Sequence, residues 1–291
     1  MSAHGVCWLG GQVLPLASAK VSVMDHGLLY GDGVFEGIRF YSARPLLLAA
    51  HLRRLENSAS AIALTLPWSE QEITSVVSEV IAAYGQPDGY IRLVVTRGVG
   101  ALGINPASCS NPELIVIADG LRMISAEARE QGVCAVIAST RRLPLDGLDP
   151  RVKSLNYLNQ ILARIEANRA GAEEALMLNA QGRVAEGTAD NVFVVRGGEL
   201  LTPPVTDGAL EGITRGVVMQ LGREAGLGVR EVSLAPYDLY TADECFLTGT
   251  GAELIPVREI DGRGMKICPG PVYGMLSRAF ADFIVQQTGD F

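Results

Sequence analysis

Lysine is scarce in this sequence, although positive charge is not. Of its 24 lysines and arginines only three are lysines: Lys20, Lys153 and Lys266. Arginine keeps its proton in proteins, so a reaction that needs a titratable primary amine can use only one of three side chains.

Cysteine, histidine and long apolar runs are also limited. The five cysteines are odd in number, widely spaced and without a Cys-x-x-Cys pair, which favours reduced thiols over a disulfide framework. The three histidines have no ligand spacing, so we expect no metal. A net charge of −8 without a basic block argues against a nucleic-acid partner. Because no apolar run has the length of a membrane span and the N-terminus lacks the positive start of a signal peptide, we expect a soluble cytoplasmic protein without a membrane partner.

The chain has 291 residues, and its proportions of hydrophobic and charged residues are those of a globular protein. Apolar alternation predicts strands over residues 34–41, 90–97, 113–118, 133–138, 229–232 and 244–247, and hairpins over 175–186 and 191–202. Helical spacing predicts helices over residues 48–64, 69–84 and 212–225.

The apolar strand pattern stops at Asp119 and Gly120 and resumes only after Gly132, which predicts a division of the chain into two domains. We expect a small N-terminal α+β domain over residues 1–118, an interdomain linker over 119–131 and a larger C-terminal domain over 132–291.

Lys153 is the most suggestive of the three lysines. It stands just before an apolar periodicity that predicts an amphipathic helix and comprises Leu155, Leu158, Ile161, Leu162 and Ile165. A side chain at such a junction can face a cleft, and an amine that is partly desolvated there can attack a carbonyl. From this stretch alone, a surface lysine at a helix start is the alternative.

The strand predicted over residues 34–41 has one face made of Phe35, Gly37, Arg39 and Tyr41. A glycine inside a strand indicates either a bulge or the close approach of another group to the backbone. On the strand over residues 90–97, Tyr90 and Arg92 share a face.

Residues Gly98–Gly103 match the glycine spacing of a dinucleotide-binding fingerprint, and a nicotinamide enzyme is the hypothesis that follows from it. That fingerprint requires a helix to open at its last glycine. Here a loop rich in serine, asparagine and proline follows instead, and we reject the hypothesis.

Two stretches predict anion sites. Gly212, Ile213 and Thr214 begin a predicted helix, where exposed amides and the helix dipole favour negative charge. The turn from Thr248 to Gly251 offers two hydroxyls and accessible amides. Together with Lys153 and the carboxylate of Glu186, these are the groups needed to bind pyridoxal phosphate. A non-catalytic binding module would leave them without a role.

Four segments carry a resemblance to a known family: Lys153–Tyr157, Glu186–Asn191, Leu210–Arg215 and Thr248–Glu253. In order and spacing they resemble the fold type IV, or class IV, aminotransferases. The resemblance implies a two-domain α+β fold, with a small N-terminal domain and a larger C-terminal pseudo-barrel. It also implies pyridoxal 5′-phosphate bound between the domains, and a homodimer or higher homo-oligomer.

The resemblance also implies roles for individual residues. Lys153 would be the catalytic residue that binds the cofactor covalently and moves a proton, and Glu186 would pair with the pyridine nitrogen. Tyr157 would bond the phenolic oxygen, and Leu210 would pack on the ring. The phosphate would be bound by Arg54, Gly212, Ile213, Thr214 and Thr250.

Phe35-x-Gly37-x-Arg39 and Tyr90-x-Arg92 look like the pattern of the branched-chain amino acid aminotransferases. In that group these residues line the substrate pocket with Tyr30 of the other subunit, and Tyr90 with the amides at Thr250 and Gly251 takes the α-carboxylate. The implied reaction is transamination between leucine, isoleucine or valine and 2-oxoglutarate, a step of branched-chain amino acid biosynthesis.

Substrate preference stays open at this point, because two features depart from the pattern. Gly251 stands where many members have alanine, and the segment after Gly120 lacks a tryptophan that some members carry. The alternatives within the fold are a D-amino acid aminotransferase and an aminodeoxychorismate lyase.

Overall fold

The structure is a computed structural model that describes residues 5–120 and 126–289. The chain forms two compact units. Unit 1 comprises Met1–Leu121, Val152–Asn156 and Ile284–Phe291, and unit 2 comprises Arg122–Arg151 and Tyr157–Phe283. The predicted α+β fold class is confirmed, whereas the domain bounds at 118 and 132 stay a prediction.

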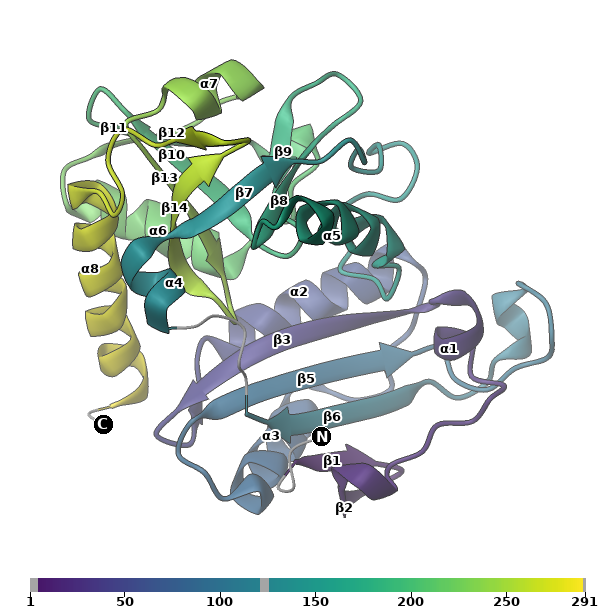
Figure 1. Ribbon diagram of the computed structural model, residues 1–291. Coiled ribbons are helices and arrows are strands. Elements are labelled where there is room, and N and C mark those ends of the chain that lie inside the picture. The colour runs from purple at the N-terminus through teal and green to yellow at the C-terminus, as the bar shows by residue number, and fades with distance from the viewer. Residues whose placement is uncertain (1–4, 121–125, 290–291) are drawn as a thin grey trace. The chain divides into compact units, whose positions relative to one another are not determined.

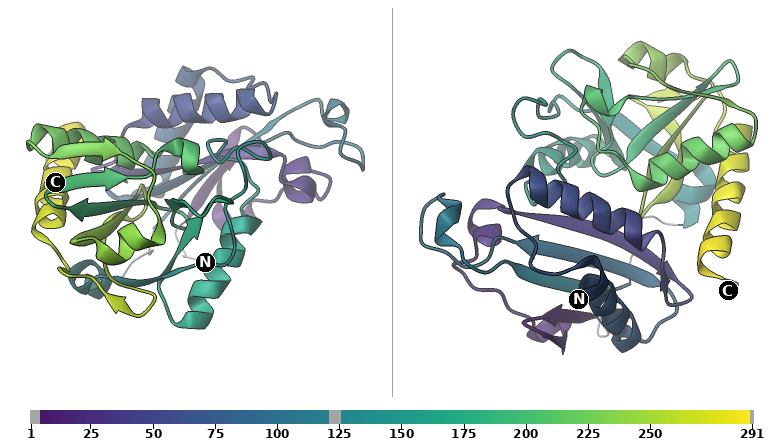
Figure 2. Two further views of the ribbon diagram at one scale, coloured as in Figure 1. Left: turned by 90° about the horizontal axis from the view of Figure 1, so that it is seen from above. Right: turned by 180° about the vertical axis from the view of Figure 1, so that it is seen from behind.

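Unit 1 is built on an antiparallel six-stranded sheet with strand order β2-β1-β6-β5-β3-β4. The strands are β1 (Val6–Leu9), β2 (Gln12–Pro15), β3 (Gly33–Tyr41), β4 (Arg44–Pro45), β5 (Gly89–Thr96) and β6 (Glu113–Asp119). Helices α2 (Leu48–Ala61) and α3 (Glu70–Tyr84) cover one face of this sheet (Figures 1 and 2). A short helix, α1 (His26–Tyr30), precedes β3.

The core of unit 1 follows from the period of its strands. In β5 the buried side chains of Ile91, Leu93 and Val95 alternate with less buried ones, so one face packs on α2 and α3. A capping box begins α3, since Ser69 Oγ accepts from the Glu72 amide and Glu72 Oε2 accepts from the Ser69 amide.

Unit 2 is built on a nine-stranded sheet of order β12-β11-β10-β13-β14-β7-β8-β9, with β15 paired to β14. The strands are β7 (Val133–Ile137), β8 (Glu174–Leu178), β9 (Val184–Glu186), β10 (Asn191–Arg196), β11 (Glu199–Thr202), β12 (Gly228–Glu231), β13 (Glu244–Gly249), β14 (Glu253–Ile260) and β15 (Arg263–Gly264). The helices after β6 are α4 (Ala126–Gln131), α5 (Leu158–Ala170), α6 (Ile213–Glu224), α7 (Pro236–Thr241) and α8 (Pro271–Thr288).

Both predicted hairpins are confirmed, as β8 with β9 and β10 with β11. The sequence predicted no element after Gly251, where the structure contains β14, β15 and α8. Among the described residues, no helix combines the length and the apolar character that crossing a membrane requires.

The helix predicted from the apolar periodicity after Lys153 is present as α5, and its apolar stripe is exposed. The apolar residues Leu158, Ile161, Leu162 and Ile165 are exposed, by 67%, 51%, 48% and 38%. Small side chains, Ala163 and Ala167, are buried instead, packed with Ala175 and Met177 of β8. Alanines let the helix approach the strands closely, so the larger apolar side chains project outward.

Candidate active site

Lys153 lies outside regular secondary structure in the segment that leads into α5, as predicted, and the helix begins at Leu158. The segment Val152–Asn156 belongs to unit 1. The Phe35 amide of β3 donates to the Lys153 carbonyl over 3.0 Å, and the Lys153 amide donates to Ser58 Oγ of α2 over 3.1 Å. The Lys153 backbone is therefore fixed by contacts that do not involve its side chain.

The Lys153 side chain lies over the aromatic ring of Phe35. Lys153 Nζ is 4.6 Å from the ring centroid, and Arg92 Cζ of β5 is 4.5 Å from the same centroid. Cations are attracted to aromatic faces by the ring quadrupole. The structure thus brings three predicted site residues together around one buried ring.

Gly37 allows Tyr90 to lie directly against β3. The register of β3 with β5 runs without a break from Gly33 to Phe40 and pairs Gly37 with Arg92, so the glycine does not mark a bulge. A Cβ placed on Gly37 would be 1.9 Å from Tyr90 Oη. Close approach of the Tyr90 hydroxyl is therefore the physical reason for glycine at this position.

Arg39 lies on the same face of β3 as Phe35 and Gly37. Its Cζ is 5.0 Å from the Tyr41 ring centroid, and its buried Nε has no hydrogen-bond partner among the described residues. Neither Arg39 nor Arg92 forms an ion pair with a carboxylate of residues 5–120 or 126–289. This face therefore offers two guanidinium groups to an anion.

Arg54, the predicted phosphate-binding arginine, lies on the opposite side of β3. Its Nε donates to Glu36 Oε1 over 2.7 Å and its Nη2 donates to Glu36 Oε2 over 2.8 Å. His51 Nδ1 lies 2.7 Å from Glu36 Oε2 and must be the donor, because an ionised carboxylate only accepts. Burial lowers the pKa of His51 despite this hydrogen bond, so the imidazole is neutral.

The ionised state of Glu36 can be tested through the pH dependence of the protein's free energy of unfolding. Burial raises the pKa of the Glu36 carboxyl, but the hydrogen bonds from Arg54 and His51 have the larger, opposite effect. The pKa is therefore lowered from 4.5 to about 2. A carboxyl whose pKa is depressed on folding stabilises the folded state above its unfolded pKa and loses that contribution as the pH falls toward its folded pKa. The stabilising contribution of Glu36 is therefore lost between pH 4.5 and about pH 2.

We expect the difference in free energy of unfolding between the wild type and Glu36→Gln to become smaller as the pH falls. Free energies of unfolding from urea titrations, at about pH 6 and at about pH 3, would measure this difference. A difference that stays constant over this range would contradict the ionised, paired state of Glu36.

Tyr30 is the last residue of α1, and a glycine-rich loop holds it. Tyr30 Oη accepts from the Gly103 amide over 2.8 Å, and His26 Nε2 is 2.9 Å from the Ala101 carbonyl oxygen. A 3-10 turn, Pro106–Ser108, follows this loop in place of the helix that a dinucleotide fingerprint needs. The structural condition for a dinucleotide fingerprint is therefore not met at Gly98–Gly103.

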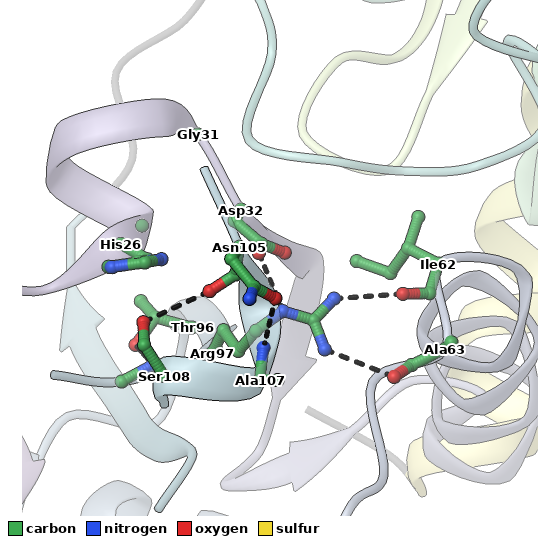
Figure 3. Close-up of polar contacts among 12 residues, drawn as sticks. His26, Gly31, Asp32, Ile62, Ala63, Thr96, Arg97, Asn105, Ala107 and Ser108 are labelled. Carbon is green, nitrogen blue, oxygen red and sulfur yellow. Dashed lines mark hydrogen bonds and ion pairs between the residues drawn. The ribbon is translucent and has the colours of Figure 1, made fainter. Parts of the chain in front are cut away.

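Arg97 connects the turn after α1 to the end of α2 (Figure 3). Its Nε donates to Asp32 Oδ2 over 2.6 Å, while Nη1 and Nη2 donate to the carbonyls of Ala63 and Ile62 over 3.0 and 2.8 Å. A guanidinium that satisfies carbonyls at a helix C-terminus also complements the helix dipole. The chain that leads from Tyr30 into β3 is therefore fixed against α2.

In unit 2, the carboxylate of Glu186 is buried and accepts from groups of Arg142, Leu210 and Asn191. Arg142 Nη2 lies 2.6 Å from Oε1, and Oε2 accepts from the Leu210 amide over 2.9 Å and from Asn191 Nδ2 over 3.3 Å. Asn191 Nδ2 also donates to the Leu210 carbonyl over 2.9 Å. Glu186 is thus held in a fixed orientation at the end of β9, beside the segment that leads into α6.

The two predicted anion sites are also in unit 2. Gly212 is the N-cap of α6 and makes no side-chain cap hydrogen bond, so the first amides, at Ile213 and Thr214, depend on other acceptors. Thr250 and Gly251 form the turn that follows β13. Thr248 Oγ1, at the end of that strand, is buried without a partner among the described residues.

A family model described as amino-transferase class IV matches residues 33–260, which is most of the chain. The chain belongs to the class IV aminotransferases. A protein of Methanocaldococcus jannaschii named as a putative branched-chain-amino-acid aminotransferase is 51% identical over 256 residues, which cover 88% of this chain and 88% of the relative.

Two crystal structures of branched-chain amino acid aminotransferases have the same fold. The Escherichia coli structure has a TM-score of 0.93 and 36% identity, covering 98% of this chain and 96% of its own. The Thermobaculum terrenum structure, in the PLP form (holo form), has a TM-score of 0.86 and 33% identity, covering 97% and 94%.

The residues of this class IV aminotransferase fit a phosphorylated pyridine. The uncapped amides of α6 and the buried, unpartnered Thr248 hydroxyl are donors that an anion can satisfy. The carboxylate of Glu186 is a suitable partner for a protonated ring nitrogen.

The predicted site residues fall into two groups. Unit 1 contains Tyr30, Phe35, Gly37, Arg39, Arg54, Tyr90, Arg92 and Lys153, and unit 2 contains Tyr157, Glu186, Leu210, Gly212, Ile213, Thr214, Thr250 and Gly251. Within unit 1 the structure brings Phe35, Tyr90, Arg92 and Lys153 together, and it places Tyr30 on α1. Tyr157 is the N-cap residue of α5.

Sequence reasoning missed Glu36 and Arg142, which pair with the predicted site residues Arg54 and Glu186, and it missed His51, which bonds to Glu36. Glu36 had a signal, because an acidic residue in the middle of an apolar strand is costly unless it is paired. Arg142 had none, since it stands in a polar stretch after β7 and reaches Glu186 only through the fold.

Proposed function

We propose that this protein is a branched-chain amino acid aminotransferase that uses pyridoxal 5′-phosphate to move the amino group of leucine, isoleucine or valine to 2-oxoglutarate. The observation that carries the proposal is the cluster in which Lys153 Nζ and Arg92 Cζ lie 4.6 and 4.5 Å from the Phe35 ring centroid. The names of its relatives in Methanocaldococcus jannaschii and Escherichia coli support the same substrate class.

Lys153 would bind the cofactor covalently and then carry the proton that leaves the substrate Cα. The bound cofactor supplies an electron-accepting ring next to that carbon. Glu186 would hold a proton on the ring nitrogen, because Arg142 and the N–H donors of Leu210 and Asn191 orient its carboxylate. Tyr157 would bond the phenolic oxygen, and Leu210 would pack on the ring.

Arg54, the α6 amides of Ile213 and Thr214, and Thr250 would bind the phosphate. The α6 amides suit this role because no side chain caps them and the helix dipole favours an anion there. The substrate carboxylate would be held by Tyr90 with the amides at Thr250 and Gly251.

Arg39 and Arg92 would let one pocket accept both an apolar side chain and the second carboxylate of glutamate. Both guanidinium groups lie on aromatic rings, of Tyr41 and of Phe35, which compensate the charge when no anion is present. The buried Nε of Arg39, which has no partner among the described residues, is a donor that a carboxylate would satisfy.

We expect Arg39→Met and Arg92→Met to impair glutamate turnover selectively. Loss of a charged hydrogen bond to the substrate should lower kcat/KM for glutamate about 10- to 100-fold, whereas kcat/KM for leucine should change by less than about threefold. Single half-reactions with each amino acid would measure the two values separately. The exposed Arg53→Met variant is the control, and an equal loss with both substrates would mean that the arginines act only structurally.

The visible absorption spectrum tests the proposed function directly. A yellow protein that bleaches on addition of L-leucine, and not of D-alanine, is the expected result. Bleaching with D-alanine alone would point to a D-amino acid aminotransferase, and pyruvate release from aminodeoxychorismate to a lyase. A protein that stays colourless with pyridoxal 5′-phosphate would overturn the proposal.

We further propose that the protein works as a homodimer, or a higher homo-oligomer, in the cytoplasm. The cysteine pattern suggests the compartment. Two exposed apolar surfaces support self-association. One is the α5 stripe of Leu158, Ile161, Leu162 and Ile165, and the other includes Leu102 and Ile104 of the loop beside Tyr30, exposed by 75% and 84%.

We expect the double substitution Ile161→Glu and Leu162→Glu to shift the protein toward the monomer, because two buried charges in an apolar interface cost several kcal/mol, on the order of 2 or more each. Sedimentation velocity would measure the shift. Gln71→Glu, at an exposed polar position of α3, is the control. An unchanged sedimentation coefficient would exclude the α5 stripe from the interface.

A further inference from the structure

Glu36 is a fully buried carboxylate in the middle of β3. The neighbouring residues Phe35 and Gly37 point to the face of the strand that carries the proposed substrate site. Because side chains alternate along a strand, Glu36 points to the other face, toward α2. β3 therefore contributes to the site on one face and places a negative charge against α2 on the other.

The two oxygens of Glu36 fix the plane of the Arg54 guanidinium. Nε and Nη2 of Arg54 donate to different carboxylate oxygens, over 2.7 and 2.8 Å, in a bidentate pair. A single hydrogen bond would let the guanidinium rotate about it, whereas two parallel bonds fix both its direction and its plane. The Arg54 side chain is 13% exposed and Glu36 is not exposed at all, so the pair is little screened by water.

His51 holds the carboxylate in turn. Its Nδ1 donates to Oε2 of Glu36, the oxygen that also accepts from Arg54 Nη2, and the imidazole is itself 2% exposed. His51 and Arg54 are both on α2, so the carboxylate of β3 is bonded from two turns of one helix. Glu36 thus has a single orientation, and through it so does Arg54.

We propose that Glu36 is a positioning residue, which holds the Arg54 guanidinium in the orientation that binds the phosphate of the cofactor. This proposal rests on the proposed function, in which Arg54 is a phosphate ligand. Arg54 without Glu36 would keep its charge but not its orientation. Because the other parts of the cofactor do not contact Arg54 in this scheme, the loss should concern the phosphate alone.

The test compares two ligands that differ only in the phosphate. The protein, freed of cofactor, is titrated with pyridoxal 5′-phosphate and with pyridoxal, and binding is followed by visible absorption. We expect Glu36→Gln to weaken binding of pyridoxal 5′-phosphate by about 10- to 100-fold and to leave binding of pyridoxal within about twofold of the wild type. An equal loss for both ligands, or no loss for either, would overturn the proposal.

A double-mutant cycle tests whether Glu36 acts through Arg54. Arg54→Lys retains a positive charge but cannot form the bidentate pair. In the Arg54→Lys background, Glu36→Gln should have no further effect on the preference for the phosphorylated ligand. A full additional loss in that background would mean that Glu36 acts by another route, and the proposal would fail.

Two further variants control for folding. Glu36→Asp keeps the buried charge but withdraws the oxygens by one methylene group, and it should show the same selective loss even if Glu36→Gln does not fold. Glu244→Gln removes a carboxylate that is buried to a similar degree in unit 2, where it accepts from the amides of Val272 and Tyr273. It should bind both ligands like the wild type.

The outcomes separate this proposal from the one it rests on. A wild type that takes up no pyridoxal 5′-phosphate would overturn the proposed function and this proposal together. Normal uptake by the wild type, with a reduced phosphate preference in Arg54→Lys but not in Glu36→Gln, would overturn this proposal alone.

Discussion

Replacement of Lys153 by alanine is expected to lower the transamination rate by at least about 10³-fold, because the side chain has both a covalent and a proton-transfer role. No other lysine can substitute for it. Lys20 is exposed, and the exposed Lys266 forms an ion pair with Asp243 over 2.9 Å. The fold should persist, since the backbone bonds from Phe35 and to Ser58 do not require the Lys153 side chain.

The measurement is a single half-reaction with L-leucine, followed by visible absorption, for the wild type, Lys153→Ala and Lys20→Ala. The first variant should show no spectral change on the time scale of the wild-type reaction, and the second should match the wild type. Urea titrations of all three would establish that the fold is intact. Turnover by folded Lys153→Ala at more than about one tenth of the wild-type rate would refute the role of this lysine.

Glu186→Gln is expected to lower kcat about 10²- to 10³-fold at saturating cofactor, because a neutral amide cannot hold a proton on the ring nitrogen by charge. The variant leaves the Arg142 guanidinium, which is 4% exposed, without its counter-charge. Removing one partner of a buried ion pair typically costs about 3–5 kcal/mol, so the free energy of unfolding should also fall. Stability and turnover must therefore be measured on the same samples.

Glu174→Gln separates these two effects. Glu174 is as buried as Glu186 and accepts from the amide and hydroxyl of Thr188, but it has no proposed contact with cofactor or substrate. This variant should lose stability while its folded fraction keeps the wild-type kcat. A Glu186→Gln enzyme with wild-type kcat at saturating cofactor would show that the carboxylate only orients Arg142.

Local signals determined much of the fold in advance. The alternation in β3 and β5 and the Ser69 capping box of α3 depend on residues close in sequence, and the structure agrees with each. The loop after Gly103 excluded a dinucleotide site for the same reason, since the necessary helix would have had to begin there. The class IV family was recognisable because its motifs are short segments in a set order.

The sequence alone determined the chemical groups of this protein: one suggestive lysine, a carboxylate, and helix and turn segments that can bind an anion. Only the tertiary structure decided how those groups are paired. Glu36 meets Arg54 and His51 across a strand and a helix, and Arg142 meets Glu186 from a distant loop. The tertiary structure also decided that Tyr90 occupies the space above Gly37. In the same way it decided that α5 buries its alanines and exposes its larger apolar side chains. These outcomes depend on which surfaces approach each other in space, and the residues that approach are far apart in the chain, so no local periodicity encodes them.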